Sequence, residues 1–477
     1  MKQQHSSSSW TNPVHSFILL ILLLVVIGYL VLVLQAPPHL AILFCLMLAV
    51  GYGFIKKIPW RVMDKGIREG ISSGITSVII FMLIGVLIAV WISAGTIPSM
   101  IVYGFNLISA DYFLVTAFIL CAIVGTSIGS AFTTAATLGV AFMGMGSMLG
   151  LEPALIAGAV ISGAFFGDKM SPLSDTTNLA PGMAHVDLFV HIRHMMWTTL
   201  PAFAISLVLF WMIGSSQGSS VLTDFETMQQ GLMANSYISW ATFLPPLVLF
   251  VLAIKRVPAI PALFVGIVVS VVLIFITQPQ MQLLQLLNVM ANGYVSETGI
   301  AAIDSLLSRG GIQSMMMSVS LILLALGLGG ILYEIGMIQD LVSSIQRFVK
   351  TRARLIFSTA ISGIGVNVLV GEQYLSIILP GRAFLTKFDE LGLARKNLSR
   401  VLEDAGTVVN PLVPWSVCGV YLTGVLGVPT LDYLPYAFFC LLCPVITMIL
   451  GVTGIGVPTA EKAGQVPRNV KLEKSIT

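Results

Sequence analysis

The stretch from Gly167 to Asn178 places two carboxylates and several neutral oxygen groups inside an otherwise apolar part of the chain. Oxygen donors of this kind are the ligands that hard cations such as Na⁺ prefer. Pro172 lacks a backbone N–H, so it breaks a helix and frees a carbonyl one turn earlier. The stretch therefore predicts a cation site at a helix break, and its candidate ligands are Asp168, Ser171, Asp175, Thr176, Thr177 and Asn178.

A polar loop at a membrane surface is the alternative for this stretch. Residues 154–166, which precede the break, are apolar but only about 13 in number. At ~1.5 Å per residue they are too short to cross a bilayer. We therefore expect the break to lie within the membrane, where unpaired backbone groups and charges are tolerated only inside protein or beside water.

Further polar residues lie in three other apolar segments. Thr126 and Ser127 complete the candidate cation ligands, although such hydroxyls often bond back to their own helix. For Glu403 the alternative is an ion pair with Arg400 near the membrane surface. We predict that a second set of residues carries protons or a co-substrate, namely Asn367, Glu372, Glu403, Asp404, Thr407 and Asn410.

The elements that position these residues must be membrane helices. Of the 477 residues, 56% are hydrophobic and 9% are charged, whereas a soluble domain carries roughly 25% charged residues. The net charge is +3 and the basic residues fall in loops, so nucleic-acid binding has no support. We predict an all-α integral membrane protein in contact with the lipid bilayer.

Hydrophobic segments divide into complete spans and interrupted ones. Residues 112–149 and 355–387 predict re-entrant hairpins, and residues 153–184 and 394–426 predict transmembrane helices broken at Pro172 and Pro411. The uninterrupted candidate spans are 17–34, 40–55, 71–93, 195–214, 237–254, 259–277, 315–335 and 432–451.

Basic loops and internal matches predict how the chain is threaded. The distribution of Lys and Arg places both termini in the cytoplasm. Motifs recur about 237–239 residues apart, with Pro172 matched to Pro411, which predicts two repeats of inverted topology, each with a hairpin and a broken helix. The expected parts are a disordered cytoplasmic N-terminus (1–16), a first repeat (17–214), an external loop (215–236), a second repeat (237–455) and a cytoplasmic tail (456–477).

Other reactive side chains have plainer interpretations. Cys440 and Cys443 form C-x-x-C without a second ligand pair, which favours buried helix positions over a metal site. His191 and His194 are expected on an interfacial helix that anchors to the membrane surface, with pH sensing as the alternative. Gly-x-Ser127-x-Gly lacks the strand-to-helix setting of a nucleophile, so we do not expect an enzyme.

These features together predict a secondary transporter. A proton and Na⁺ would compete for the same carboxylate oxygens, and alternating exposure of such a site amounts to antiport. We expect no cofactor and no metal beyond transported Na⁺, with H⁺ as the second cargo. A Na⁺-coupled exchanger of small organic anions is the alternative, since hydroxyl-rich helix N-termini can bind anions.

The run from Gly163 to Pro181 (GAFFGDKMSPLSDTTNLAP) resembles the signature of the NhaC-type sodium/proton antiporter family. Further likenesses are GTSIGS from Gly125, GEQYLSIILPG from Gly371 and LEDAGT from Leu402, so the resemblance covers roughly residues 17–455. It implies Na⁺/H⁺ exchange in a prokaryotic cytoplasmic membrane, movement of one domain like an elevator, and a homodimer. It also implies that some relatives exchange malate for lactate. Glu372 stands where the family would commonly have Asp.

Overall fold

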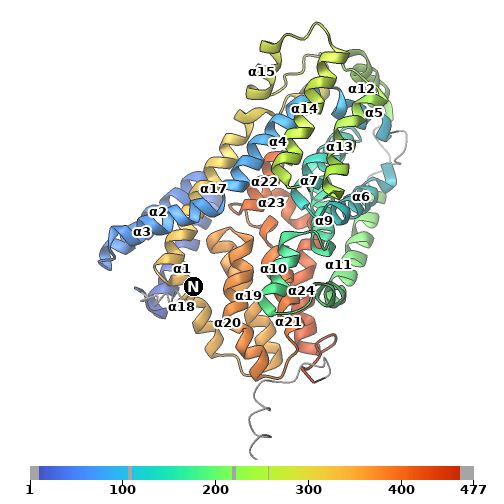
Figure 1. Ribbon diagram of the computed structural model, residues 1–477. Coiled ribbons are helices and arrows are strands. Elements are labelled where there is room, and N and C mark those ends of the chain that lie inside the picture. The colour runs from blue at the N-terminus through green and yellow to red at the C-terminus, as the bar shows by residue number, and fades with distance from the viewer. Residues whose placement is uncertain (1–9, 106–109, 217–221, 256, 462–477) are drawn as a thin grey trace, which may run out of the picture.

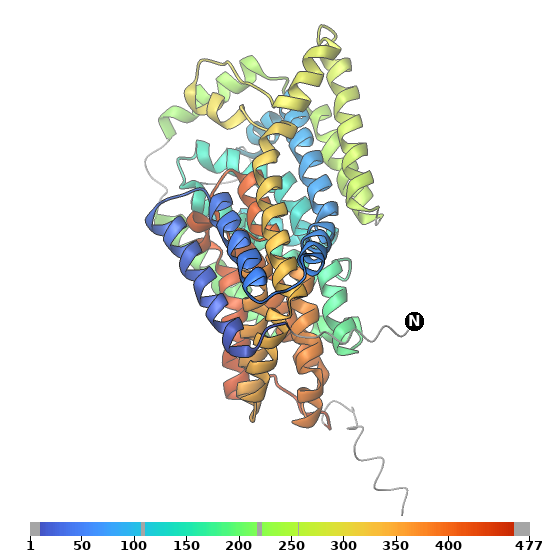
Figure 2. The same ribbon diagram turned by 90° about the vertical axis from the view of Figure 1, so that its left-hand side faces the viewer.

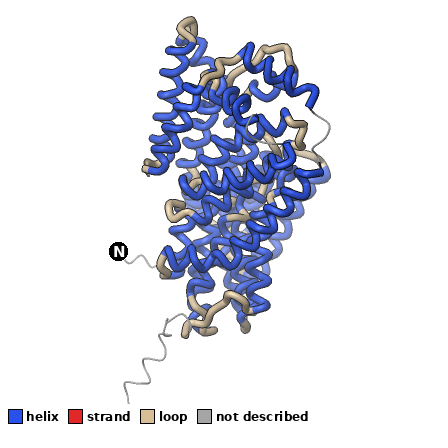
Figure 3. Tube along the Cα trace, turned by 90° about the vertical axis from the view of Figure 1, so that its right-hand side faces the viewer, coloured by secondary structure: helices blue, strands red, loops and turns tan. Residues whose placement is uncertain are grey.

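Helices and their connecting loops make up the whole described part of the chain (Figure 3). The computed structural model describes residues 10–105, 110–216, 222–255 and 257–461. Within these ranges eight helices are long and apolar enough to cross a bilayer, and three bent helix pairs raise the possible spans to eleven. The predicted all-α membrane architecture is confirmed.

One group of helices forms a frame along one side of the molecule (Figures 1 and 2). Its long helix α17 packs on α2, α3 and α4, and α4 packs in turn on α14. Gly66 and Gly70 let α3 approach the α17 backbone so closely that a Cβ at Gly70 would lie 2.1 Å from the Leu326 carbonyl oxygen. The frame helices are α1 (Pro13–Gly28), α2 (Pro38–Ile55), α3 (Trp60–Ser73), α4 (Ile75–Ser93), α5 (Thr96–Phe105), α13 (Leu244–Ile254), α14 (Ala259–Thr277), α17 (Gly311–Glu334) and α18 (Met337–Arg347).

The other group, the core, holds the interrupted segments. Helix α10 from the first half packs on α20 and α21 from the second, and α11 packs on α24, so the two halves interlock. The core helices are α6 (Phe113–Ile128), α7 (Ala131–Thr134), α8 (Val140–Met148), α9 (Pro153–Met170), α10 (Asp175–Ala184), α11 (Leu188–Ser216), α19 (Arg352–Val370), α20 (Gln373–Glu390), α21 (Arg395–Leu402), α22 (Val417–Leu426), α23 (Thr430–Tyr433) and α24 (Phe438–Thr453).

Both hairpins turn on a glycine followed by a capping residue. Gly129 ends α6 with φ +72°, and the Ser130 side chain accepts a hydrogen bond from the Thr133 N–H to begin α7. Gly371 ends α19 with φ +74°, and the Glu372 carboxylate accepts from the Leu375 N–H to begin α20. Glycine adopts this left-handed conformation without steric cost, so each segment reverses within two residues.

Both predicted helix breaks are present. Helix α9 ends at Met170, and α10 begins after its N-cap Ser174. In the second half, α21 continues into a π-helical turn (Glu403–Thr407) and a 3₁₀ turn (Asn410–Leu412) before α22 begins after its N-cap Ser416. The polar sequences around Pro172 and Pro411 therefore interrupt helices as expected.

The two halves repeat the same local geometry 242 residues apart. The left-handed glycines Gly129 and Gly150 correspond to Gly371 and Gly392. The helix bounds agree as well, because α10 (Asp175–Ala184) and α22 (Val417–Leu426) begin and end at this spacing. The expected spacing of 237–239 was therefore about three residues short, and Pro172 corresponds to Pro414 rather than to Pro411.

Several segments differ from the expected boundaries. Helix α1 already begins at Pro13, capped by the Asn12 side chain, so residues 13–16 are helical. The expected external loop contains α12 (Leu222–Asn235). At the start of the tail, the Pro458 carbonyl accepts from the Ala394 N–H, which attaches the tail to α21. Residues 1–9 and 462–477 lie outside the described residues.

The segments predicted to be external lie together at one end of the molecule. Helices α12, α15 (Leu283–Asn292) and α16 (Ala301–Leu307) connect core and frame elements, and Figure 1 places α12 and α15 at the top, far from the connection between α20 and α21 at the bottom. The basic residues Arg395 and Lys396 begin α21 at that lower end. Which end faces the cytoplasm remains a prediction.

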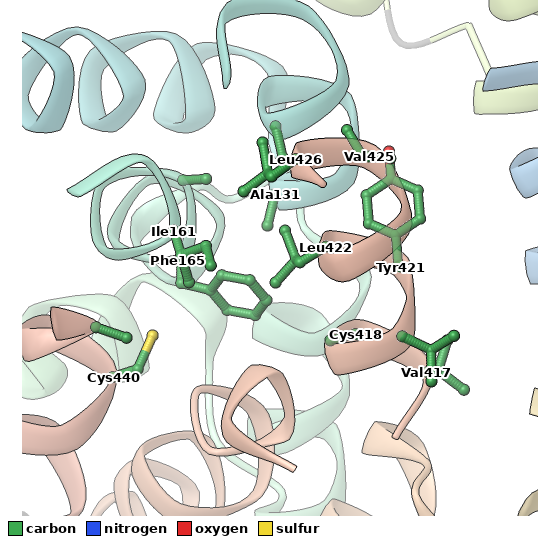
Figure 4. Packing of buried hydrophobic residues seen from close by; sticks show 14 of the residues in the cluster. Ala131, Ile161, Phe165, Val417, Cys418, Tyr421, Leu422, Val425, Leu426 and Cys440 are labelled. Atoms are coloured by element: carbon green, nitrogen blue, oxygen red, sulfur yellow. The ribbon is translucent and has the colours of Figure 1, made fainter. Parts of the chain in front are cut away.

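Apolar side chains fill the space between the two broken helices (Figure 4). Phe165 of α9 points toward Leu422 of α22, and both are buried. The ring of Tyr421 stacks on Phe132 at the first hairpin tip with centroids 4.2 Å apart, and its hydroxyl donates to the Phe132 carbonyl at 2.7 Å. The hairpin tip of the first half is thus held by the second half.

Candidate functional site

A cavity of about 790 Å³ lies between the first hairpin tip, the first break and the frame helices α13 and α14. The frame side of its wall is apolar, with Leu249, Ile260 and Leu263. No Lys, Arg or His is found among the described residues that line it. Its polar lining residues are Thr76, Ser130, Thr133, Asp168, Ser174, Asp175, Thr176, Gln373 and Tyr374. The site is therefore negatively charged and faces an apolar wall.

Asp168 lies at the centre of the polar wall, in the last turn of α9. Its carboxylate accepts hydrogen bonds from the side chains of Ser174 and Thr176 and from the backbone of Ala131. Ala131 is the first residue of α7, so one carboxylate joins the broken helix to the N-terminus of a hairpin arm. The hydroxyls of Ser174 and Thr176 are themselves 3.1 Å apart. Carboxylate and hydroxyl oxygens thus lie together where a cation needs them.

Asp175 adds the second carboxylate. It is the first residue of α10 and is exposed where it lines the cavity. A negative charge at a helix N-terminus is favoured by the helix dipole, so the position suits an ionised carboxylate without a basic partner. Asp168, Asp175 and Thr176 are the three predicted cation ligands that the structure places on the cavity.

The other predicted cation ligands hold the backbone of the break together. The Thr177 hydroxyl donates to the carbonyl oxygens of Asp168 and Lys169, both at 3.1 Å. The Asn178 amide donates to the Pro172 and Ser174 carbonyls at 2.9 and 2.7 Å. These bonds satisfy carbonyls that the broken helix would otherwise leave without partners.

Three predicted hydroxyl ligands are also bonded to backbone. Ser171 Oγ accepts from the Leu173 N–H at 3.2 Å. Thr126 and Ser127 donate to the carbonyls of Ala122 and Ile123, four residues earlier, at 2.8 and 2.9 Å. Because these hydroxyls do not line the cavity, the structure does not bring them to the carboxylates.

In the second half, two predicted residues are bonded to each other. The Asn410 amide nitrogen donates to Asn367 Oδ1 at 2.8 Å, and both side chains are fully buried. Glu372, only 6% exposed, uses its carboxylate to cap α20 by accepting from the Leu375 N–H at 2.8 Å. Tyr374 lies close enough to feel the charges of Asp168, Asp175 and Glu372.

Glu403 and Asp404 are buried in the π-helical turn but have different surroundings. Asp404 forms an ion pair with Lys169 and accepts from the Thr198 hydroxyl at 3.0 Å. Neither carboxylate oxygen of Glu403, which is fully buried, has a hydrogen-bond partner among the described residues. Asp168 and Lys169 are its charged neighbours.

The alternative of an ion pair between Glu403 and Arg400 is not found among the described ion pairs. Arg400 instead donates to the Gly456 carbonyl at 2.8 Å. Thr407, a further predicted residue, is buried one turn after Glu403, and its carbonyl accepts from the Gln373 side chain at 3.1 Å. Glu403 therefore has the environment of a proton carrier rather than of a surface charge.

The expectation of a surface position for His191 and His194 is wrong. Both are buried on α11, where His191 Nδ1 lies 2.9 Å from Ser399 Oγ and His194 Nε2 lies 3.1 Å from Asn397 Oδ1. The polar face of α21 takes up these rings, so they pack between helices instead of contacting headgroups. Cys440 and Cys443 are buried on α24 as expected.

Two site residues were not among the predicted ligands. Ser130 and Ser174 line the cavity and cap α7 and α10. Each precedes a helix start by one position and has a Thr three residues later, a pattern typical of a capping Ser. Cap recognition could have identified both from the sequence.

The family and its members provide an independent comparison. The model of the Na⁺/H⁺ antiporter family matches residues 163–455. The chain is 46% identical over 425 residues to the Na⁺/H⁺ antiporter NhaC of Alkalihalophilus pseudofirmus, covering 89% of this chain and 92% of that protein. It is 41% identical over 454 residues to NhaC of Bacillus subtilis, covering 94% and 99%.

A relative with another printed activity is more distant. The chain is 33% identical over 366 residues to the malate-2H⁺/Na⁺-lactate antiporter of Bacillus subtilis, covering 76% of this chain and 78% of that protein. All three relatives are antiporters, and the predicted resemblance is confirmed. The chain belongs to the Na⁺/H⁺ antiporter family.

Proposed function

We propose that the protein exchanges Na⁺ for H⁺ across the membrane, with Asp168 and Asp175 as the carboxylates that bind the cation. The observation that carries the proposal is a cavity with two carboxylates, three hydroxyls beside them and no described basic side chain. Na⁺ prefers such oxygen ligands. Identity above 40% over most of the chain to two Na⁺/H⁺ antiporters supports the same activity.

Coupling follows from competition for the same oxygens. An ionised Asp168 attracts Na⁺, and a protonated Asp168 has no charge with which to hold it. The nearest cationic group on the chain, Lys169, is already paired with Asp404 and so leaves the charge of Asp168 uncompensated. Release of one ion on binding of the other, at a site that opens alternately to each side, gives exchange.

Glu403 is the second part of the proposal, as the carboxyl that carries a proton. It is fully buried beside Asp168, and neither of its oxygens is used by a described hydrogen-bond donor. A buried carboxylate without a partner is costly, whereas its protonated form is not. Glu372 has a backbone donor instead, which supports a role in holding the second hairpin tip.

Exchange of small carboxylates is the less favoured reading. An organic anion in this cavity would face Asp168 and Asp175 without a described basic partner. Buried anions of that kind are stabilised by Arg or Lys. The relative with malate and lactate in its name is also less similar, at 33% identity, than the two Na⁺/H⁺ antiporters.

The remaining organisation is proposed with the function. We infer a prokaryotic cytoplasmic membrane, cytoplasmic termini, inverted repeats, an elevator-like movement of the core against the frame, and a homodimer. The repeat spacing of 242 residues and the separation of core from frame support this arrangement.

Purified protein in liposomes with a pH-sensitive dye inside tests the proposal. After a pH gradient is imposed, we expect Na⁺ alone to dissipate it, and malate or lactate to be unnecessary. Asp168→Asn and Asp175→Asn should each abolish the response, while the exposed frame variant Asp64→Asn should retain it. A requirement for an organic acid, or wild-type rates in both site variants, would refute the proposal.

A further inference from the structure

The second helix break repeats the first with an amide in place of a carboxylate. Asn410 lies 242 residues after Asp168. Three residues later both chains are extended, at Ser171 and Val413, and the N–H of each bonds back to the carbonyl of Asp168 or Asn410. Because backbone geometry matches on both sides, the two side chains start from equivalent positions.

Every polar atom of the Asn410 side chain is occupied by the protein. Its oxygen accepts from the Cys418 N–H at 2.9 Å, and its nitrogen donates to Asn367 Oδ1 at 2.8 Å and to the Gly371 carbonyl at 3.3 Å. Asn367 is held in turn, since its nitrogen donates to the Gly406 carbonyl at 2.6 Å. All four side chains or backbone groups are buried.

The partners of Asn410 correspond to the surroundings of Asp168. Cys418 lies 242 residues after Thr176, which contacts Asp168, and Gly371 corresponds to the hairpin glycine Gly129. In both halves a side chain at the break therefore meets a hairpin tip and the first turn of the following helix. In the second half the NH₂ group of Asn410, with its partial positive charge, faces two neutral oxygens.

We propose that the second break is a latent monovalent-cation site in which the Asn410 amide nitrogen takes the place of the ion. Asn367 Oδ1 and the Gly371 carbonyl are the oxygens that an ion there would bind. The inference rests on the proposed function, which assigns transported Na⁺ to the equivalent Asp168. It limits the chain to one bound Na⁺, at the first break.

Substitution of the amide should convert the latent site into a working one. In Asn410→Asp the new carboxylate would face Asn367 Oδ1 and the Gly371 carbonyl, two acceptors that repel it unless a cation or proton lies between them. Asn and Asp have nearly the same shape, so the surrounding packing is retained. A bound Na⁺ would then have one carboxylate and two neutral oxygens as ligands.

The test is the number of ²²Na⁺ ions bound per chain by purified full-length protein at saturating Na⁺ and alkaline pH. Wild type should bind one, Asn410→Asp two, Asp168→Asn none and the exchanged variant Asp168→Asn/Asn410→Asp one. Restored binding in the exchanged variant is the most specific outcome, because a nonspecific loss of packing cannot produce it.

The failures are distinguishable. Two ions on wild type, or none regained by a folded exchanged variant, would overturn the latent site while leaving the proposed function intact. If Asn410→Asp does not fold, the wild-type count alone decides, one ion supporting the inference and two refuting it. Absence of Na⁺ binding and exchange in wild type would instead refute the proposed function.

Discussion

Lys169 and Asp404 form an ion pair in which neither side chain is exposed. Lys169 belongs to the last turn of α9 and Asp404 to the π-helical turn that interrupts the second broken helix, so the pair joins the two breaks. The Thr198 hydroxyl donates to the same carboxylate oxygen, and Cys443 Sγ lies 3.6 Å from Lys169 Nζ. The pair holds the regions around Asp168 and Glu403 in one body.

Breaking this pair should be costly, and removing both members should not. Lys169→Met leaves the Asp404 charge buried and uncompensated, which costs about 3–5 kcal/mol, whereas an apolar replacement of both partners is often neutral. We therefore expect a marked loss of thermal stability in Lys169→Met and recovery of most of it in Lys169→Met/Asp404→Leu. Thermal unfolding of detergent-purified protein, followed by fluorescence, measures both.

An exposed ion pair in the frame supplies the control. Lys65 Nζ lies 2.6 Å from Glu334, but the Lys65 side chain is 45% exposed. Such pairs contribute about 0–1 kcal/mol, so Lys65→Met should change stability little. Equal losses in Lys65→Met and Lys169→Met would contradict a special role for the buried pair.

The first hairpin tip should tolerate no side chain at Gly129. Its φ of +72° disfavours Ala, and a Cβ there would lie 2.6 Å from Leu173 Cβ in the break. Gly392 has a similar φ of +64° but no atom within 4 Å of an added Cβ. Gly129→Ala should therefore be less stable than Gly392→Ala by about 1–3 kcal/mol, the usual cost of overpacking, and slower in exchange.

Thermal unfolding and proton flux of these two variants, measured side by side, separate backbone strain from collision. Comparable behaviour of Gly129→Ala and Gly392→Ala would mean that the hairpin tip does not press on the break.

Local sequence rules predicted the breaks because Pro172 and Pro411 each lie among polar residues in apolar segments. They could not supply the partner of Lys169, since Asp404 follows 235 residues later and only tertiary packing brings the two together. The repeat was detected but placed about three residues off, because Pro411 and Pro414 both resemble Pro172 in composition. Helix caps, not composition, decide between them.

The candidate site was predicted in part for the same reason. Oxygen-bearing residues within the first break were correctly taken as a group, but a helix break must also satisfy its own carbonyls. Thr177 and Asn178 do this, while Ser130 and Ser174 reach the cavity. Which hydroxyl turns inward depends on the hairpin tip, which comes from elsewhere in the chain.

Glu403 is expected to carry a proton. Glu403→Gln retains the shape of the side chain but cannot be ionised, so Na⁺ binding should persist while proton-driven Na⁺ uptake falls by roughly tenfold or more. The control is Glu390→Gln, which removes an exposed carboxylate paired with Lys387 at 2.6 Å. ²²Na⁺ binding and uptake in liposomes measure the two effects, and wild-type uptake in Glu403→Gln would remove Glu403 from the mechanism.

Asp304 should stabilise the segment between α15 and α16 in a pH-dependent manner. Hydrogen bonds from the Thr298 N–H and hydroxyl, both at 2.7 Å, together with one from Ser296, hold the pKa of Asp304 below its usual range. A carboxylate with a lowered pKa contributes stability above its unfolded pKa and loses it as the pH falls through the folded value.

Amide hydrogen exchange of residues 294–300 tests this assignment. Protection should decrease in acid in wild type, and in Asp304→Asn it should be low at every pH. Equal protection in the two proteins at neutral pH would contradict it.

The central claim is that Na⁺ and H⁺ compete for the Asp168 and Asp175 carboxylates, and the apparent Na⁺ dissociation constant measured against pH by ²²Na⁺ binding tests it most directly. If one proton must leave for each Na⁺ bound, the constant should rise about tenfold for each unit by which the pH falls on the acid side, with no measurable binding in Asp168→Asn. A dissociation constant that does not change with pH, or binding of wild-type strength in Asp168→Asn, would contradict the claim.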